Sequence, residues 1–413
     1  MMKFLLVFIL SSLSIWSHES DLRIHLPTQN PRAPIYIGTL KGQNTSYLKD
    51  LQSILENDLN YTGLLQVVSS STSIPFSVKW NVSGSFLNAS VTDTRSGVVK
   101  HYNEIKLSGK LDQDRRQIHK LADTITSQLC HKQGIASTRI LYSHQKEGAT
   151  WQAEIWECDW DGANAHPITH EGSYCITPVL IPSSSRFLYV SYKIGQPKIY
   201  ASSLNGETGQ RVVALQGNQL LPAISPRLDK IAFISDASGR TDLFVQPINL
   251  HTGEGGKPVQ LYSYPNATQA SPTFNPDGSQ IAFVSDKDGG MRIYTISATP
   301  RAERSLARMI SKKNRENSCP NWSPDGRKLA YSAKTNGIRQ IWIYDFDTEE
   351  EWQLTSGEGN KENPCFAPDG LHLVFNSTNA TSSELYVVNL NQPEALKISK
   401  GSGHKHYPNW GHR

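Results

Sequence analysis

Short apolar runs recur along the C-terminal part of the chain, and each is set between polar turns. Residues 281–284, 329–331 and 373–375 are such runs, and each follows a Pro-Asp-Gly turn. In these turns the proline fixes φ at the second position, and the glycine tolerates the backbone that the turn requires. Because every residue of a run is apolar, both faces of the strand must be covered. The pattern therefore predicts short buried strands joined by tight turns.

A proline followed two residues later by an apolar residue repeats through the same region. We call these the anchor prolines: Pro178, Pro222, Pro272, Pro320, Pro364 and Pro408. They are spaced by about 44 to 50 residues, which is the length of one four-stranded blade of a β-propeller. Six anchors predict six blades.

The first and last units of this repeat are incomplete in a complementary way. Residues 139–142 and 154–156 match a second and a third strand with no first strand before them, whereas residues 407–410 match a first strand with no second strand after it. We expect these pieces to pair and close the ring, because closure removes the open sheet edges of a linear array. The predicted fold class is mixed, with an N-terminal α/β domain at 21–134 followed by an all-β six-bladed propeller at 136–413.

The N-terminus has the pattern of a secretory signal peptide at residues 1–20. Lys3 precedes an apolar run at 4–10, and small residues follow it. This run is too short to span a bilayer, and the pattern does not specify the cleavage site. We expect the remaining chain to be soluble outside the cytoplasm and not itself membrane-spanning.

Residues 21–134 show both helical and strand periodicity. Apolar and polar residues alternate at 22–26 and 76–82, and a turn at 95–97 joins two further strands. The leucines at 48, 51, 55 and 59 form one helical face, which begins near Thr45 and ends by Gly63. A second amphipathic helix runs from 118 to 129 and is expected to end at Gly134. These elements predict a small α/β domain.

Three stretches of the chain have a characteristic sequence: residues 138–142, the Asp159-Trp160-Asp161-Gly162 turn and residues 407–410. In these stretches the chain resembles the TolB family, the periplasmic propeller proteins of the Tol–Pal system of Gram-negative bacteria. The order of signal peptide, α/β domain and propeller carries the resemblance, which covers the whole chain. It implies a periplasmic protein-binding scaffold without cofactor, which supports outer-membrane integrity and envelope invagination during cell division.

The resemblance also implies two partners. A Pal-like outer-membrane lipoprotein would bind the propeller, and a TolA-like inner-membrane protein would bind a segment at about 21–28. The strand within this segment consists of Leu22, Arg23, Ile24, His25 and Leu26. A short alternating strand can add to a partner's sheet edge or detach from its own domain. The alternative is an ordinary strand of the small domain.

The loops that lead into the inner strands are predicted to form one mouth of the propeller channel. We expect eight polar residues there to contact the partner: Gln219, Gln269, Glu316, Asn317, Glu362, Asn363, Lys405 and His406. Such a ring suits an extended peptide or loop, with aromatic residues below it as anchors. The alternative is a hydrated pore mouth without a partner.

The two alternatives to a protein-binding scaffold are an enzyme and a propeller that binds a small ligand. A hydrolase on a propeller would need a Gly-x-Ser-x-Gly motif, which the chain lacks. No nucleophile, base and orienting group can be assembled from the sequence, so we predict that the protein is not an enzyme. The sequence does not exclude the alternative function of a secreted propeller that binds a small ligand or sugar. The formal net charge of +4 is too small to indicate nucleic-acid binding, and a monomer is expected.

Cysteine and histidine offer few signs of special chemistry. The chain has five cysteines: Cys130, Cys158, Cys175, Cys319 and Cys365. None of them forms a Cys-x-x-Cys pair, the spacing that would indicate a zinc or redox site. A disulfide between Cys319 and Cys365 and a pair of buried thiols are both compatible with the blade repeat. His404, His406 and His412 gather near the C-terminus, where we expect a polar rim and no metal.

Overall fold

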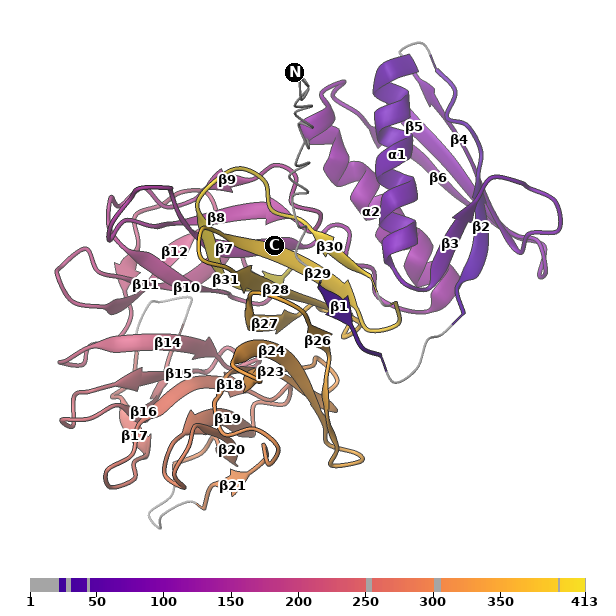
Figure 1. Ribbon diagram of the computed structural model, residues 1–413. Helices are drawn as coiled ribbons and strands as arrows, with labels where there is room; N and C mark the ends of the chain where they lie inside the picture. The colour runs from indigo at the N-terminus through magenta and orange to yellow at the C-terminus, as the bar shows by residue number, and fades with distance from the viewer. Residues whose placement is uncertain are drawn as a thin grey trace, which may run out of the picture.

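The computed structural model describes residues 22–26, 31–42, 45–249, 255–300, 306–392 and 394–412. The predicted signal peptide at 1–20 lies outside these residues. Within these ranges, no helix combines the length and apolar composition needed to cross a membrane. The described chain forms an α/β part followed by a ring of sheets (Figure 1).

The α/β part is a five-stranded sheet with two helices. The sheet order is β3-β2-β4-β5-β6, in which β2 runs parallel to β3 and β4 while the remaining pairs are antiparallel. The elements are β2 (Ala33–Ile37), α1 (Thr45–Tyr61), β3 (Leu65–Val68), β4 (Phe76–Ser83), β5 (Phe86–Asp93), β6 (Val98–Lys106) and α2 (Leu111–Cys130). The predicted leucine face of α1 is buried, because Leu51, Leu55 and Leu59 have no exposed surface.

The end of the second helix differs from the prediction. α2 ends at Cys130, and His131 caps it in the left-handed conformation with φ of 53°. The backbone N–H of His131 donates to the carbonyl of Ser127, which satisfies one of the last free carbonyls of the helix. The predicted end at Gly134 was therefore too late.

The ring consists of six four-stranded blades, as predicted. Blade 1 consists of β10 (Cys175–Leu180), β11 (Arg186–Ser191), β12 (Lys198–Ser203) and β13 (Gln210–Arg211). Blade 2 consists of β14 (Gln219–Ile224), β15 (Lys230–Ser235), β16 (Asp242–Pro247) and β17 (Val259–Tyr262). Blade 3 consists of β18 (Gln269–Phe274), β19 (Gln280–Ser285), β20 (Arg292–Ser297) and β21 (Arg308–Met309). Blade 4 consists of β22 (Asn317–Trp322), β23 (Lys328–Thr335), β24 (Ile338–Asp345) and β25 (Glu351–Gln353). Blade 5 consists of β27 (Asn360–Phe366), β28 (His372–Thr378), β29 (Ser383–Asn389) and β30 (Ala395–Lys397). Blade 6 consists of β31 (His404–Gly411), β7 (Arg139–Gln145), β8 (Glu154–Asp159) and β9 (His166–Pro167).

One aromatic side chain from the second strand of each blade lies in the propeller core. These residues occupy the same position of the repeat and are buried: Tyr142, Tyr189, Phe233, Phe283, Tyr331 and Phe375. The strands that contain these apolar runs are therefore covered on both faces, as the continuous apolar pattern requires.

Blade 6 closes the ring by joining the two ends of the propeller. Its inner strand β31 pairs antiparallel with β7, with Trp410 opposite Ile140. Trp410 is buried, and its indole Nε1–H donates to Thr138 Oγ1 over 2.6 Å. The inner strand β31 also contacts β27 on one side and β10 on the other. The predicted closure is confirmed.

The α/β part packs against blades 5 and 6 (Figure 1). One buried apolar cluster runs from the helices into these blades, and the rings of Tyr61 and Trp160 lie 5.3 Å apart across the seam. Nearby, the buried ring of His372 contacts the carbonyl of Tyr61 through Nε2 and Asp369 through Nδ1. The two parts therefore share one core.

Closure by Trp410 leads to a stability prediction. Trp410→Ala should lower the free energy of unfolding by about 3–5 kcal/mol, because it leaves a cavity and removes a buried hydrogen bond. Denaturant unfolding of the full chain measures this change. Trp151→Ala is the matched control, since Trp151 lies in blade 6 but is 74% exposed. Equal stability of the two variants would contradict the role given to Trp410.

Candidate functional site

A repeated backbone irregularity marks one end of the propeller channel. The residue before each anchor proline has a left-handed backbone, with φ between 49° and 55°: Thr177, Leu221, Ser271, Cys319, Asn363 and Tyr407. The pairing of each inner strand with its neighbour shifts at this point, as in a β-bulge. Left-handed residues other than glycine are uncommon, and residues before proline normally prefer extended backbone. Such conformations persist only where the fold enforces them.

These six residues, which we call the mouth ring, line a cavity of about 120 Å³. Beyond it, a second cavity of about 430 Å³ is lined by the far ends of the inner strands, including Phe274, Trp322 and Trp410. Three anchor prolines line both cavities: Pro222, Pro272 and Pro320. The channel thus has a narrow, proline-lined middle between the mouth ring and a wider aromatic end.

Seven of the eight predicted mouth residues lie within inner strands and not in loops, and only Glu316 precedes its strand. Four of the seven are buried. Gln219, Gln269, Asn317 and Lys405 stand three positions before their anchor prolines, within the inner strands, and are buried. Gln219 Nε2 donates to the carbonyl of Leu215, and Lys405 Nζ donates to that of Gly401, each over 2.6 Å. Asn317 and, in its corrected amide orientation, Gln269 also donate to loop carbonyls. The loop placement was wrong, because these side chains are buried and hold loop carbonyls. Gln219, Asn317 and Lys405 fasten their own incoming loops, whereas Gln269 holds Thr241 of the preceding blade.

Lys361 occupies the same position in blade 5, and the sequence analysis missed it. Its side chain has no exposed surface, and Nζ donates to the carbonyls of Gly357, Glu358 and Gly359. Burial lowers the pKa of Lys361 to about 8. The signal in the sequence was a recurring long polar residue three places before the proline.

The other predicted mouth residues form a polar arc over blades 4 to 6. Glu316 is exposed, with an oxygen 3.2 Å from Lys334 Nζ, and Glu362 lies 3.5 Å from Arg339 Nε. Asn363 belongs to the mouth ring and donates from Nδ2 to Asn376 Oδ1 over 2.8 Å. Glu362, Asn363 and His406 are half-buried. This arc keeps polar groups accessible beside the channel.

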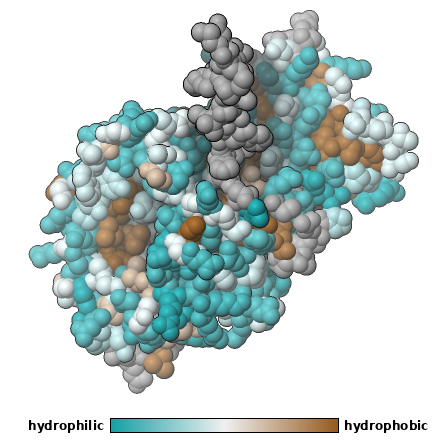
Figure 2. Space-filling model, in the orientation of Figure 1, coloured by the Kyte–Doolittle hydropathy of each residue, from teal (hydrophilic) through white to brown (hydrophobic). Residues whose placement is uncertain are grey.

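An aromatic arc adjoins it on blades 6 and 1, and sequence analysis missed it as well. Trp151 is in the loop between β7 and β8, Tyr174 precedes β10, and Tyr192 follows β11. The Trp151 and Tyr174 rings, like those of Tyr174 and Tyr192, lie 5.8 Å apart edge-to-face. Ile194 is also exposed in the loop after β11. The surface visible in Figure 2 is mostly hydrophilic with separate hydrophobic patches, so such exposed apolar groups are local features.

The N-terminal strand lies on the propeller and not in the small domain's sheet. β1 (Arg23–Ile24) pairs antiparallel with β26 (Thr355–Ser356), which follows the outer strand of blade 4 (Figure 1). The backbone N–H of His25 donates to the carbonyl of Leu354 over 2.7 Å. The apolar side chains of Leu22, Ile24 and Leu26 pack against a buried cluster of blades 4 and 5 that includes Leu354 and Phe375. The interpretation of β1 as a strand of the small domain is therefore wrong.

The remaining sequence hypotheses concern cysteine and histidine. All five cysteines are free thiols, so Cys319 and Cys365 are not joined. The imidazoles of His404 and His406 stack with centroids 6.1 Å apart, whereas His412 lies beside Gln133. The three histidines do not converge on one point.

Comparisons with known proteins agree with this geometry. The family model of the TolB beta propeller domain matches residues 126–413. A TolB homolog from Protochlamydia amoebophila is 44% identical over 404 residues, which cover 87% of this chain and 86% of that protein. A TolB homolog from Chlamydia trachomatis serovar L2 is 36% identical over 354 residues, 84% of this chain and 81% of that protein.

The chain belongs to the TolB family. A crystal structure of TolB from Acinetobacter baumannii shares the fold, with a TM-score of 0.78, 20% identity and coverage of 95% of this chain and 99% of that chain. The predicted family and fold class are confirmed. Family membership makes the protein a component of the Tol–Pal system.

A pH prediction follows from His406 in the polar arc. Burial, and then the nearby His404, lower the pKa of His406 to about 4, against about 6.5 in an unfolded chain. Below about pH 6.5 the His406 imidazole is protonated in the unfolded state but stays neutral in the folded state. The free energy of unfolding therefore falls as the pH drops from about 6.5 to 4. His406→Gln should make this loss shallower in denaturant unfolding at several pH values. An unchanged pH profile would contradict the assignment.

Proposed function

We propose that this TolB-family protein is a periplasmic scaffold without catalytic activity, which binds a Pal-like lipoprotein at the propeller mouth and a TolA-like protein through its N-terminal segment. The observation that carries the proposal is the mouth ring, in which every blade holds one strained residue at the same end of the channel. Strained backbone of this kind is concentrated at functional sites.

The surroundings of the mouth ring suit a protein partner. The polar arc offers carboxylate, amide and imidazole groups, and the aromatic arc offers exposed apolar surface. Protein interfaces combine these features, with Trp and Tyr as energetic anchors and polar groups around them. A loop or extended peptide of the partner would place its apolar side chains against Trp151 and Tyr174. Its backbone would meet the polar groups of the adjoining arc.

The thiols that line the channel support a non-enzymatic role. Burial raises the pKa of Cys319, and it raises that of Cys365 to about 11, where the backbone N–H of Trp410 donates to Sγ. Protonated, buried thiols are poor nucleophiles. Both cysteines therefore contribute to packing in this proposal and not to chemistry.

The docked N-terminal strand suits the second partner. Pairing with β26 uses one edge of β1 and hides three apolar side chains against the propeller. A partner that binds β1 through these apolar side chains must first displace the strand from β26. The propeller then competes directly with the TolA-like protein for the same strand.

The mouth assignment is tested by Trp151→Ala and by Glu362→Ala. Truncation of an exposed aromatic anchor should weaken binding of the soluble domain of the Pal-like lipoprotein by about 10- to 100-fold. Isothermal titration calorimetry measures the affinity, and melting should stay unchanged. Asn363 is left intact, since its Nδ2 donates to Asn376 Oδ1 and asparagine tolerates the left-handed backbone better than alanine does. Phe86→Ala in β5 of the α/β part is the exposed control.

Full binding by both mouth variants would place the interface elsewhere on the protein.

The competition for β1 is tested from the propeller side with Ser356→Pro. Proline lacks the N–H that a paired strand residue donates, so β1 should detach. We expect tighter binding of the TolA-like protein by several fold and faster tryptic cleavage after Arg23. Ser356→Ala keeps the backbone N–H and serves as the control. Faster cleavage without tighter binding would refute the competition between β26 and the partner.

A further inference from the structure

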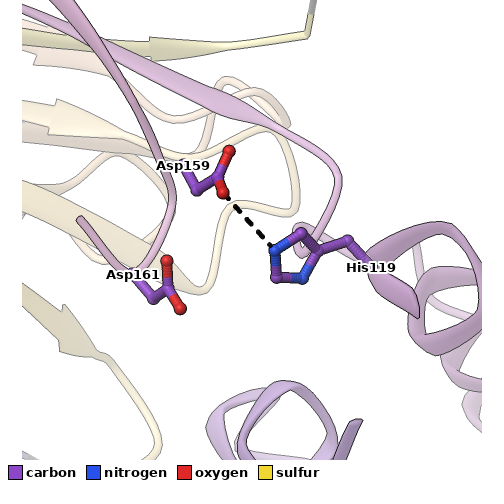
Figure 3. Close-up of side chains that lie close together, drawn as sticks. All are labelled: His119, Asp159 and Asp161. Carbon is purple, nitrogen blue, oxygen red and sulfur yellow. Dashed lines mark ion pairs between the residues drawn. The ribbon is translucent and has the colours of Figure 1, made fainter. Parts of the chain in front are cut away.

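A buried group of metal-ligating side chains lies at the seam between the α/β part and blade 6. His119 projects from α2, Asp159 ends β8, and Asp161 lies in the turn that follows (Figure 3). One ligand atom of each residue lies within 4.8 Å of the others. His119 and Asp159 are each 1% exposed. The three side chains thus converge from two separately folded parts of the chain.

The ring of His119 is held in a defined orientation. Asp58 Oδ2 lies 2.7 Å from His119 Nδ1, and Asp58 Oδ1 accepts a hydrogen bond from Trp160 Nε1 over 2.9 Å. An ionised Asp58 accepts from Nδ1–H of His119, and a neutral imidazole held in this way presents the lone pair of Nε2 on its other side. A carboxylate behind a histidine in this way is the usual support of a metal-bound imidazole.

The other ring nitrogen points at the aspartates. His119 Nε2 lies 3.8 Å from Asp159 Oδ2 and has no hydrogen-bond partner among the described residues. This separation is too long for a hydrogen bond. It fits two ligands of one metal, because bonds from zinc to nitrogen or oxygen are about 2.0–2.2 Å long.

Two arginines partly neutralise the cluster. Arg115 Nε lies 3.4 Å from Asp159 Oδ2, and its Nη2 contacts Asp161 Oδ2. Arg139 contacts Asp159 and lies 3.7 Å from Glu157. With Asp58 included, the cluster still has four carboxylates against two guanidinium groups. Buried excess negative charge favours a further cation.

We propose that His119, Asp159 and Asp161 bind a divalent transition metal of the zinc type, with Asp58 as the residue that orients His119. The imidazole and carboxylate ligands are those that such ions accept. Water would complete the coordination. To admit the metal, the guanidinium of Arg115 must leave both Asp159 and Asp161, and Asn164 Nδ2 must release Asp159 Oδ2. The ion would connect α2 to blade 6 and so fasten the α/β part to the propeller.

The test uses the full chain after treatment with a chelator. Co²⁺ replaces Zn²⁺ as a spectroscopic probe, and calorimetry with Zn²⁺ measures the affinity. We expect binding of one ion per chain and a higher melting temperature when the metal is present. His119→Gln should abolish the visible absorption of bound Co²⁺. Asp58→Asn should weaken binding by about 10- to 100-fold.

Arg115→Gln separates metal binding from a purely structural ion-pair network. It removes the competing cation, so Zn²⁺ should bind more tightly than to the natural chain, an outcome that misfolding cannot produce. His404→Gln, which alters the stacked histidine pair at the other end of blade 6, is the matched control and should keep full affinity. Absence of Co²⁺ binding, unchanged binding by His119→Gln, or weaker binding by Arg115→Gln would each overturn the proposal.

Discussion

The pairing of β31 with β7 is the interaction on which the whole propeller depends. It joins the last described strand to the first strand of the ring, and both flanking blades then pack against a complete blade 6. Without it, β27 and β10 would each face solvent on one side. Such open edges and uncovered faces invite association with other chains. Trp410 supports this junction by filling its interior while bonding to Thr138, just ahead of β7.

The same inner strands create the mouth. Each must start beside the channel, be fastened to an incoming loop and then pass a proline that cannot donate to the ladder. The structure meets these demands with a left-handed residue immediately before each proline and, in five of the six blades, a buried amide or ammonium group three positions before it. The geometry of the mouth is therefore set by the blade repeat. Only the side chains differ between blades, and that difference produces a polar arc beside an aromatic one.

Sequence alone was sufficient where local pattern and repeat agree. The six anchor prolines, the closure of the ring and the leucine face of α1 all follow from spacing along the chain. The position of β1 was not predictable in this way, because its partner β26 lies more than three hundred residues later and on the other part of the protein. The buried residues such as Gln219 and Lys405 were misplaced because polar side chains normally indicate surface. Here they satisfy loop carbonyls instead. The His119 cluster depends on the seam between two parts, which no periodicity reports.

The position of residues 410–412 has a practical consequence for anyone who modifies this protein. Trp410, Gly411 and His412 line the wide aromatic cavity, on the far side of the anchor prolines from the mouth ring. A tag or fusion partner joined after Arg413 would therefore begin close in sequence to the residues that line that cavity. We expect it to affect the wide end of the channel more than the mouth. An affinity handle for capturing partners at the mouth can thus share the molecule with them, whereas a ligand that enters from the wide end would be hindered.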